Sequence, residues 1–320
     1  MHRRIFLGVA GAAIVLPAGA QTPFPNRPLR LVVPFAPGGS SDVMARLVAG
    51  HMGNTLGQSV VVENRGGAGG NIGAEAVARA APDGYTVGTG SVSILSINKH
   101  LYARLPFDPD KDFTLIGLVG VLPNILIAHP SVPATDLASL IAYVKANPGK
   151  LSYASTGSGT SQHLAMEMLK TAAGLDIPAV TYRGSGQAIP DLVAGRVELM
   201  VDTMVTGAQL AREGQVRAIA VTTEAPSHLA PDMPRVSQTI PGFDAGSWLG
   251  IIAPAGLPAP VARTLEGAVE AAVKDPTVAQ RLRDLGVTPT PLVGEAFARF
   301  VAAESAKWGP VVRASGARVD

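Results

Sequence analysis

Residues 33–42 read VPFAPGGSSD and join two different patterns. The run of β-forming residues that begins at Leu29 ends at this Pro-Gly-Gly, and the following residues, VMARLVAGHM, have the spacing of an amphipathic helix. Glycines let a backbone approach another group closely, and a helix start leaves amide hydrogens without intrahelical acceptors. Taken alone, the stretch has two interpretations: a tight turn capped by Ser40 or Ser41, or an anion site at a helix N-terminus.

The first twenty residues have the pattern of a secretory signal peptide. Arg3 and Arg4 precede an apolar stretch that ends in Ala18-Gly19-Ala20. We expect cleavage after Ala20 and export, with the general secretory and twin-arginine routes both open. A membrane anchor is the weaker alternative, because a proline and several glycines interrupt a short apolar run.

The composition of the remainder excludes several classes of function. After residue 20, 24 basic residues face 24 acidic ones, and no cluster of Lys or Arg with interleaved aromatic residues occurs, so we expect no nucleic-acid partner. The chain has no cysteine, which excludes thiol catalysis, disulfides and thiolate metal sites. Its length suffices for two domains of ordinary size.

Runs of β-forming residues alternate with helical patterns along nearly the whole chain. This alternation is typical of α/β proteins with parallel, doubly wound sheets. The predicted strands are 29–34, 59–63, 85–88, 124–128, 151–154, 179–182, 197–201, 216–221 and 249–253. The predicted helices are 42–56, 73–81, 136–146, 161–173, 187–194, 258–273, 276–285 and 294–309.

The strand–helix units form two sets, after which three helices close the chain. We place lobe 1 in residues 21–122 plus 235–320 and lobe 2 in residues 123–234. The chain then crosses twice between the lobes. Two crossings predict a hinge, with the inter-lobe cleft as the ligand site.

The Gly/Ser-rich loop of residues 37–42 has a counterpart in the second half of the chain. In LSYASTGSGTSQHLAMEML, residues 151–169, a strand again runs through such a loop into an amphipathic helix. Weaker copies lie at 64–80 and 180–195. Ligands of parallel α/β sheets bind beyond the carboxyl ends of the strands. One such loop in each lobe therefore predicts an inter-lobe anion site that needs no arginine clamp.

Six segments extend this pattern into a resemblance. They are VPFAPGGSSD, ENRGGAGGNIGAEAVARAAPDGYT, LPFDPDKDFTLIG, LSYASTGSGTSQHL, VTYRGSGQAIPDLVAGRVELM and GSWLGIIAPAGLPAPV. They resemble, in order, successive signatures of the Bug family, the TctC-like extracytoplasmic solute receptors of tripartite tricarboxylate transporters. The match covers essentially all of the chain after the signal peptide. One departure is Arg-Gly-Gly at 65–67, where the family usually has Arg-Pro-Gly.

The resemblance implies a periplasmic protein with the type II periplasmic-binding-protein fold, in which two α/β lobes close on a ligand. It implies a small organic carboxylate as the ligand and the permease subunits of a tripartite tricarboxylate transporter as partners. We expect a monomer without a cofactor. Backbone amides and hydroxyls, aided by ordered water, would grip the ligand. The matching positions are Pro37, Gly38, Gly39, Ser40, Ser41 and Asp42 in one lobe, and Ser155, Thr156, Gly157, Ser158 and Gly159 in the other.

Five side chains are individual candidates, most with a functional and a structural interpretation. Asp42 either has a functional role, orienting loop amides or meeting a ligand ammonium, or is a first-turn residue that stabilises the helix dipole. Ser91 follows a strand end and either lines the cleft or bonds within its loop, and His163 either reaches the cleft or holds the Gly-rich loop. Arg183 either pairs with a second ligand carboxylate or forms a surface salt bridge. Asp202 follows a strand near the crevice and is a candidate for discriminating amino-bearing from plain acids.

Enzyme motifs do not occur in the sequence. G-x-S-x-G, G-x-x-x-x-G-K-[ST], G-x-G-x-x-G after a strand and H-E-x-x-H are absent, and the six histidines lack metal-ligand spacing. We expect Trp248 to pack in the hinge or core. The sequence thus predicts a non-enzymatic solute-binding protein. The alternatives are a ligand-binding sensor component without its own permease and, less favoured, an exported enzyme.

Overall fold

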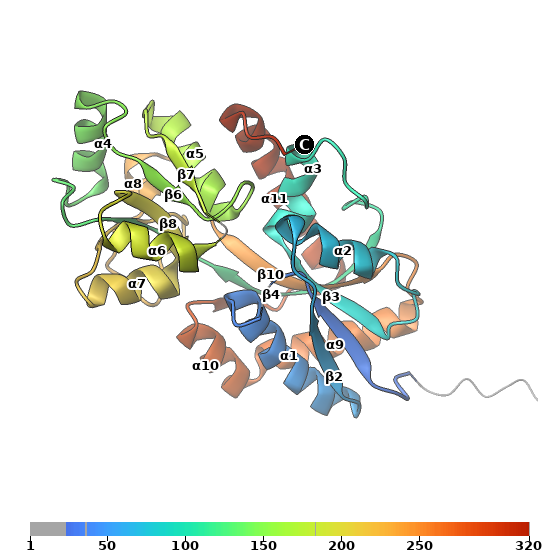
Figure 1. The fold of residues 1–320 in the computed structure, drawn as a ribbon. Coiled ribbons are helices and arrows are strands. Elements are labelled where there is room, and N and C mark those ends of the chain that lie inside the picture. The colour runs from blue at the N-terminus through green and yellow to red at the C-terminus, as the bar shows by residue number, and fades with distance from the viewer. Residues whose placement is uncertain (1–23, 36, 183, 320) are drawn as a thin grey trace, which may run out of the picture.

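Two β-sheets with helices on both faces form the two lobes of the molecule (Figure 1). The computed structural model describes residues 24–35, 37–182 and 184–319. The signal peptide predicted over residues 1–20 lies outside these ranges. Within them, no helix has both the length and the apolar character needed to cross a membrane.

The lobe 1 sheet is mixed and covered on both faces. Its strands follow the order β11 (Thr288–Pro289), β4 (Phe113–Leu122), β10 (Ser247–Pro254), β3 (Thr86–Ser91), β1 (Leu29–Val33) and β2 (Val60–Asn64). The helices α1 (Ser40–Leu56), α9 (Ala259–Lys274) and α10 (Pro276–Asp284) cover one face. The other face carries η1 (Ala68–Gly70), α2 (Asn71–Ala78), the π-helical turn η2 (Ser93–Ile97), α3 (Asn98–Leu101) and α11 (Gly294–Ser315).

The lobe 2 sheet has the same layered construction. Its strands follow the order β7 (Ala179–Thr181), β6 (Tyr153–Ser155), β8 (Leu199–Thr203), β5 (Asn124–Ala128) and β9 (Arg217–Val221). The helices α4 (Leu137–Ala146) and α5 (Ser161–Ala173) cover one face, and α6 (Ser185–Val193) and α7 (Met204–Arg212) cover the other. The short helix α8 (Val236–Thr239) lies in the segment that returns to lobe 1.

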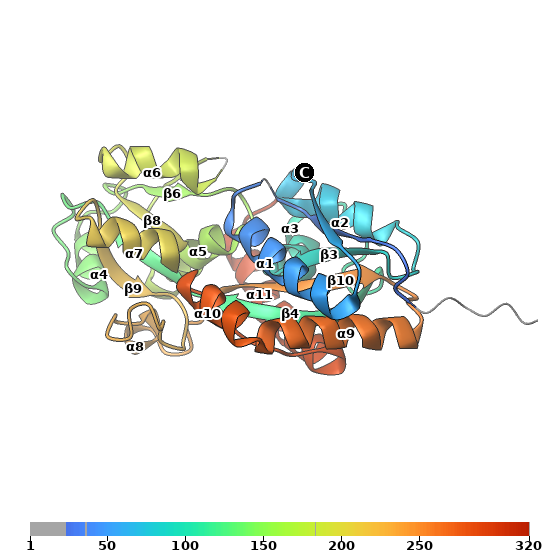
Figure 2. The same ribbon diagram turned by 90° about the horizontal axis from the view of Figure 1, so that it is seen from below.

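The chain passes between the sheets at two neighbouring points. Pro123 alone separates β4 from β5, and the return passes through Ala245 just before β10. The Ala245 carbonyl accepts hydrogen bonds from Thr222 Oγ1 (2.7 Å) and Asn124 Nδ2 (3.3 Å), so the two crossings are held together. Helix α11 also packs against α5 of the other lobe (Figure 2). The lobe limits proposed from the sequence, 21–122 with 235–320 and 123–234, stay a prediction.

The expected parallel sheets are wrong for β5 and β10, which lie beside the crossings, and for the short edge strand β11, which is antiparallel to β4. β10 is antiparallel to β3 and β4, and β5 is antiparallel to β8 and β9. A parallel neighbour needs a long crossover connection, usually a helix. Both β5 and β10 instead start at the hinge and run away from it, because the chain enters them from the other lobe.

Several elements were not predicted from the sequence, above all β4, α7 and β11. β4 carries Gly117 and Gly120, which weaken a strand signal. The structure explains Gly120 by the close approach of β11: a Cβ there would lie 2.5 Å from Val287 Cγ1 and 2.7 Å from the Thr288 carbonyl oxygen. Helix α11 also continues beyond the predicted end at residue 309, through Pro310 to Ser315.

Replacing Gly73 by alanine tests the packing of α2 on its sheet. A Cβ on Gly73 would lie 2.7 Å from Pro34 Cα and 2.8 Å from the Arg65 carbonyl oxygen, both backbone atoms. Overpacking of this kind costs about 1–3 kcal/mol, so Gly73→Ala should lower the free energy of unfolding measured in urea by that amount. Gly267→Ala in α9 is the matched control, because nothing lies within 4 Å of its Cβ position. It should stabilise the protein by roughly 0.5–1 kcal/mol. Equal effects of the two substitutions would contradict this packing.

Candidate ligand-binding cleft

A small cavity of about 120 Å³ lies between the lobes, and the described residues around it are all uncharged. Both lobes contribute to its wall, since elements from β1 to β10 reach it. The side chains with hydroxyl or amide groups are Ser40, Ser41, Ser91, Ser93, Thr160, Ser161, Gln162, Thr203 and Ser247. The apolar side chains are Phe35, Met44, Leu122, Trp248 and Leu249. The cavity is therefore rich in hydrogen-bond donors without a fixed charge of its own.

Three helices begin at this cavity. Ser40 and Ser41 are the first two residues of α1, Thr160 and Ser161 are the N-cap and first residue of α5, and Thr203 is the N-cap of α7. The first amide groups of a helix have no intrahelical acceptor, and the helix macrodipole places partial positive charge at this end. These helix starts therefore direct partial positive charge from the backbone toward the cavity.

The lobe 1 loop that precedes α1 is shaped by Asp42. Its buried carboxylate accepts hydrogen bonds from Gly38 N (2.9 Å), Asn64 Nδ2 (2.9 Å) and Arg46 Nε (3.1 Å). Burial raises the pKa of Asp42, but the hydrogen bonds from Arg46, Gly38 and Asn64 outweigh it and hold the pKa below its usual value. Asp42 thus orients a loop amide, in agreement with one of its two interpretations, while Gly39 caps α1 without a side chain.

The lobe 2 loop before α5 is held by its own side chains. Thr160 Oγ1 donates to the Gly157 carbonyl (2.9 Å) and lies 3.0 Å from Thr156 Oγ1, and Gly159 N donates to His163 Nδ1 (3.3 Å). Burial lowers the pKa of His163, which keeps Nδ1 available as an acceptor. His163 therefore supports the loop, as the structural interpretation expected. Gly159 also contacts Leu101 of lobe 1 so closely that a Cβ would overlap Leu101 Cδ2.

The remaining sequence candidates are placed differently. Ser91 lines the cavity, and its hydroxyl accepts a hydrogen bond from Ile94 N (3.5 Å). Ser155 is buried beneath the lobe 2 loop, where its hydroxyl accepts from Gly157 N (3.4 Å), whereas Ser158, Pro37, Gly38 and Gly39 are exposed on the two loops. Arg183 lies outside the described residues. Ligand contact by these loop positions stays a prediction.

Asp202 is fully buried next to the cavity residue Thr203. Its Oδ1 accepts from Ser185 Oγ and Thr203 N, both at 2.8 Å. Its Oδ2 has no hydrogen-bond partner within the described part of the chain. Burial raises the pKa of Asp202 to about 6, against the opposing effect of these two hydrogen bonds.

Sequence reasoning missed part of the cavity wall. Thr160, Ser161, Gln162, Thr203 and Ser247 were not proposed as ligand residues, and Trp248 was expected only in the hinge or core. Position along the chain could have indicated Gln162 and Thr203, because each directly follows a loop or strand that was recognised. No pattern indicated Ser247 and Trp248, which start an antiparallel strand. Within residues 24–35, 37–182 and 184–319, no group of three or more His, Asp or Glu residues could hold a metal ion.

The family that matches residues 44–317 is described as "Tripartite tricarboxylate transporter family receptor" (TctC). The chain belongs to this family. Among its relatives is Protein BugT of Bordetella pertussis, which is 35% identical over 317 residues, covering 98% of this chain and 96% of BugT. The resemblance to Bug/TctC receptors drawn from the sequence is thus confirmed.

Three solved structures are similar to this chain over most of its length. Rpa4515 of R. palustris, solved with adipate, has a TM-score of 0.85 and 35% identity, covering 93% of this chain and 100% of Rpa4515. The periplasmic binding protein BugD has a TM-score of 0.81 and 36% identity, covering 92% and 99%. MatC of Rhodopseudomonas palustris, solved with bound malate, has a TM-score of 0.79 and 35% identity, covering 90% and 100%. The predicted two-lobed periplasmic-binding-protein fold is confirmed.

The buried Asp202 should make stability depend on pH in a defined direction. Its folded pKa of about 6 lies above the ordinary 3.8, so the native state holds the proton more tightly than the unfolded state. The resulting stabilisation is present below pH 4 and is lost as the pH rises through 6. Two pKa units correspond to about 3 kcal/mol at most. Urea unfolding of the wild type and Asp202→Asn between pH 4 and 7 measures this term, and the wild type should lose about 1–3 kcal/mol relative to the variant. Parallel pH profiles would contradict it.

Proposed function

We propose that this protein is a periplasmic receptor that closes its lobes on a small organic carboxylate and presents it to the permease of a tripartite tricarboxylate transporter. The observation that carries this proposal is the start of three helices at one uncharged inter-lobe cavity. Helix N-termini are ready-made anion sites. Adipate in Rpa4515 and malate in MatC, both relatives of similar fold, support a carboxylate as the anion.

The energetics fit such a ligand without a cationic side chain. Each helix start contributes about 0.3–1 kcal/mol to an anion, and each hydrogen bond to a charged group about 1.5–3 kcal/mol. Three or four such bonds, less the cost of association, reach the roughly −8 kcal/mol of micromolar binding. A cavity of about 120 Å³ favours a small acid.

Within this proposal the ligand carboxylate lies between the two loops. The amides and hydroxyls of Ser40 and Ser41 approach it from lobe 1, and the amide of Ser161 approaches it from lobe 2, joined by the loop 155–159. The amide and hydroxyl of Thr160 instead hold the Gly157 carbonyl. Asp42 and His163 act indirectly, because their side chains hold the loop amides of Gly38 and Gly159. The protein's role is binding and release, with no chemical change of the acid.

A proline at the first position of a helix tests the backbone donor independently of the side-chain donor, because proline has no amide hydrogen. Ser40→Pro removes an amide hydrogen where proline is tolerated, and Gly39 (φ −75°, ψ 167°) already has a conformation compatible with a following proline. Ser161→Pro makes the same change in α5 after Thr160 (φ −69°, ψ 153°). Each proline variant should bind adipate or malate at least about tenfold more weakly than its alanine counterpart, measured by isothermal titration calorimetry.

Ser40→Ala and Ser161→Ala are the matched controls, since they remove only the hydroxyl groups. Thermal unfolding checks that all four variants fold. Equal affinities for the proline and alanine variants would exclude backbone capture. Conversion of the bound acid into another compound, followed by NMR, would contradict a receptor role.

Export leads to a separate expectation. The periplasmic form should start at Gln21, since the small-residue end of the leader, Ala18-Gly19-Ala20, precedes it. Mass spectrometry of the intact protein from a periplasmic extract should give the mass of residues 21–320. Retention of residues 1–20 in the periplasmic form would contradict the proposed cleavage.

A further inference from the structure

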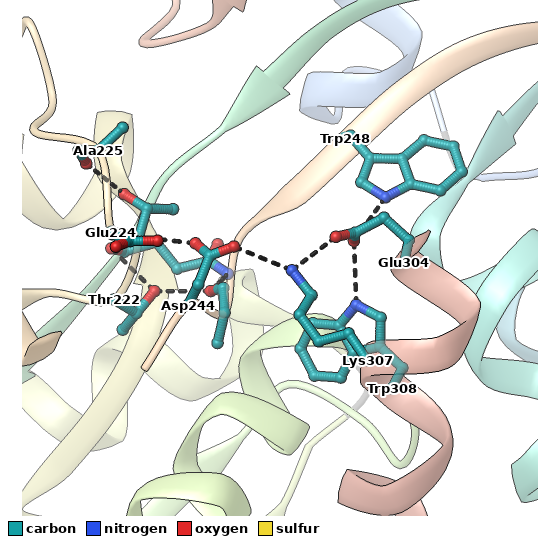
Figure 3. Close-up of polar contacts among 11 residues, drawn as sticks. Thr222, Glu224, Ala225, Asp244, Trp248, Glu304, Lys307 and Trp308 are labelled. Atoms are coloured by element: carbon teal, nitrogen blue, oxygen red, sulfur yellow. Dashed lines mark hydrogen bonds and ion pairs between the residues drawn. The ribbon is translucent and has the colours of Figure 1, made fainter. Parts of the chain in front are cut away.

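Both tryptophans of the chain donate to the same carboxylate oxygen. Trp248 Nε1 lies 2.9 Å and Trp308 Nε1 lies 3.1 Å from Glu304 Oε2, and the sequence contains no other tryptophan (Figure 3). Trp248 belongs to β10, whereas Glu304 and Trp308 belong to α11. All three side chains are buried.

The same carboxylate is linked to the second crossing between the lobes. Glu304 Oε1 accepts from Lys307 Nζ (2.6 Å), and Lys307 Nζ also contacts Asp244 Oδ2 (3.0 Å). Asp244 Oδ1 in turn accepts from Glu224 N (3.1 Å), in the chain that has just left β9. Figure 3 shows this row of contacts running from Trp248 to Glu224.

Trp248 lines two hollows. One is the ligand cavity, and the other, the rear hollow, has about 480 Å³ and is also lined by Asp244, Lys307 and Glu304. Phe297 and Phe300 meet the indole edge to face, at 5.9 and 5.5 Å between ring centroids. These rings pack against the indole, and its Nε1 group has its hydrogen-bond acceptor in Glu304, so packing and this hydrogen bond together set its orientation.

We propose that Glu304 is a positioning residue for ligand binding: it fixes the indole of Trp248 as a wall of the ligand cavity and ties that wall, through Lys307 and Asp244, to the crossing between the lobes. The inference rests on the proposed function, because it takes the inter-lobe cavity as the ligand site. It adds a group that makes no contact with the ligand and sets the shape of the site.

The charges of the network support this role. Burial lowers the pKa of Lys307, but the carboxylates of Glu304 and Asp244 outweigh it and raise the pKa, so the ammonium group stays charged. Glu224 and Arg235 are the other charged residues that line the rear hollow. A carboxylate can accept from the two indoles on one oxygen and from Lys307 on the other. A carboxamide has one acceptor oxygen, so it can serve the indoles or Lys307 but not both.

The test compares Glu304→Gln with a matched control in a protein whose only tryptophan is Trp248. Trp308→Phe supplies that background. Glu270→Gln is the control, because Glu270 Oε1 also lies 2.6 Å from a lysine, Lys274 Nζ, one turn away on an exposed part of α9. The measurements are the fluorescence emission of Trp248 and the dissociation constants for adipate and malate, with thermal unfolding to check the fold.

Glu304→Gln should change the emission of Trp248 and weaken binding of the acid by about tenfold, whereas Glu270→Gln should change neither. Lys307→Met is a second variant, which leaves the hydrogen bond from Trp248 to Glu304 in place and should weaken binding through the lost link to Asp244. Unchanged emission and affinity in Glu304→Gln would overturn the inference.

The two proposals fail separately. If the unsubstituted protein binds neither acid, the proposed function fails in this form. The emission of Trp248 in the ligand-free protein then decides the positioning role: a change in Glu304→Gln supports it, and no change overturns it. If Glu304→Gln does not fold, the affinity of Lys307→Met decides the inference: weaker binding of the acid supports it, and unchanged binding overturns it.

Discussion

The direction of the strands beside the hinge governs where every group in the cleft lies. β1, β3, β6 and β8 all run toward the gap between the lobes. The loops and helix starts that follow them are therefore delivered to one place, as Ser40, Ser91, Ser161 and Thr203 show. β5 and β10 run the other way, since they begin at the crossings, and the first residues of β10 complete the wall.

The polar character of the cleft follows from this convergence. Backbone amides and hydroxyl groups surround the cavity, while the nearby ionisable groups are used elsewhere. Asp42 holds the Gly38 amide and His163 holds the Gly159 amide, so each acts on a loop rather than on the cavity. The helices fix the directions of these amide donors. Such a site favours an anion whose oxygen atoms match the donor positions over an anion of another shape.

Contacts at the crossings and along helix α11 join the two lobes. Hydrogen bonds from Asn124 and Thr222 to the Ala245 carbonyl hold the two crossings together, and helix α11 packs against both the lobe 1 sheet and α5. Glu304 of this helix also accepts a hydrogen bond from Trp248, which lines the cavity. Helix α11, which packs against elements of both lobes, thus also contacts Trp248, a residue of the cavity wall.

The sequence by itself determined the α/β class, most helices and the two Gly/Ser-rich loops, because strand ends, glycines and helix caps are local signals. It thereby identified Ser40, Ser41 and Ser91, whose positions depend on the strand just before them. Only the tertiary structure decided the antiparallel strands, the glycine-rich β4 and the pairing of Trp248 with Glu304, 56 residues apart. These features depend on how the chain crosses between lobes, and contacts between distant segments leave no periodic pattern in either segment.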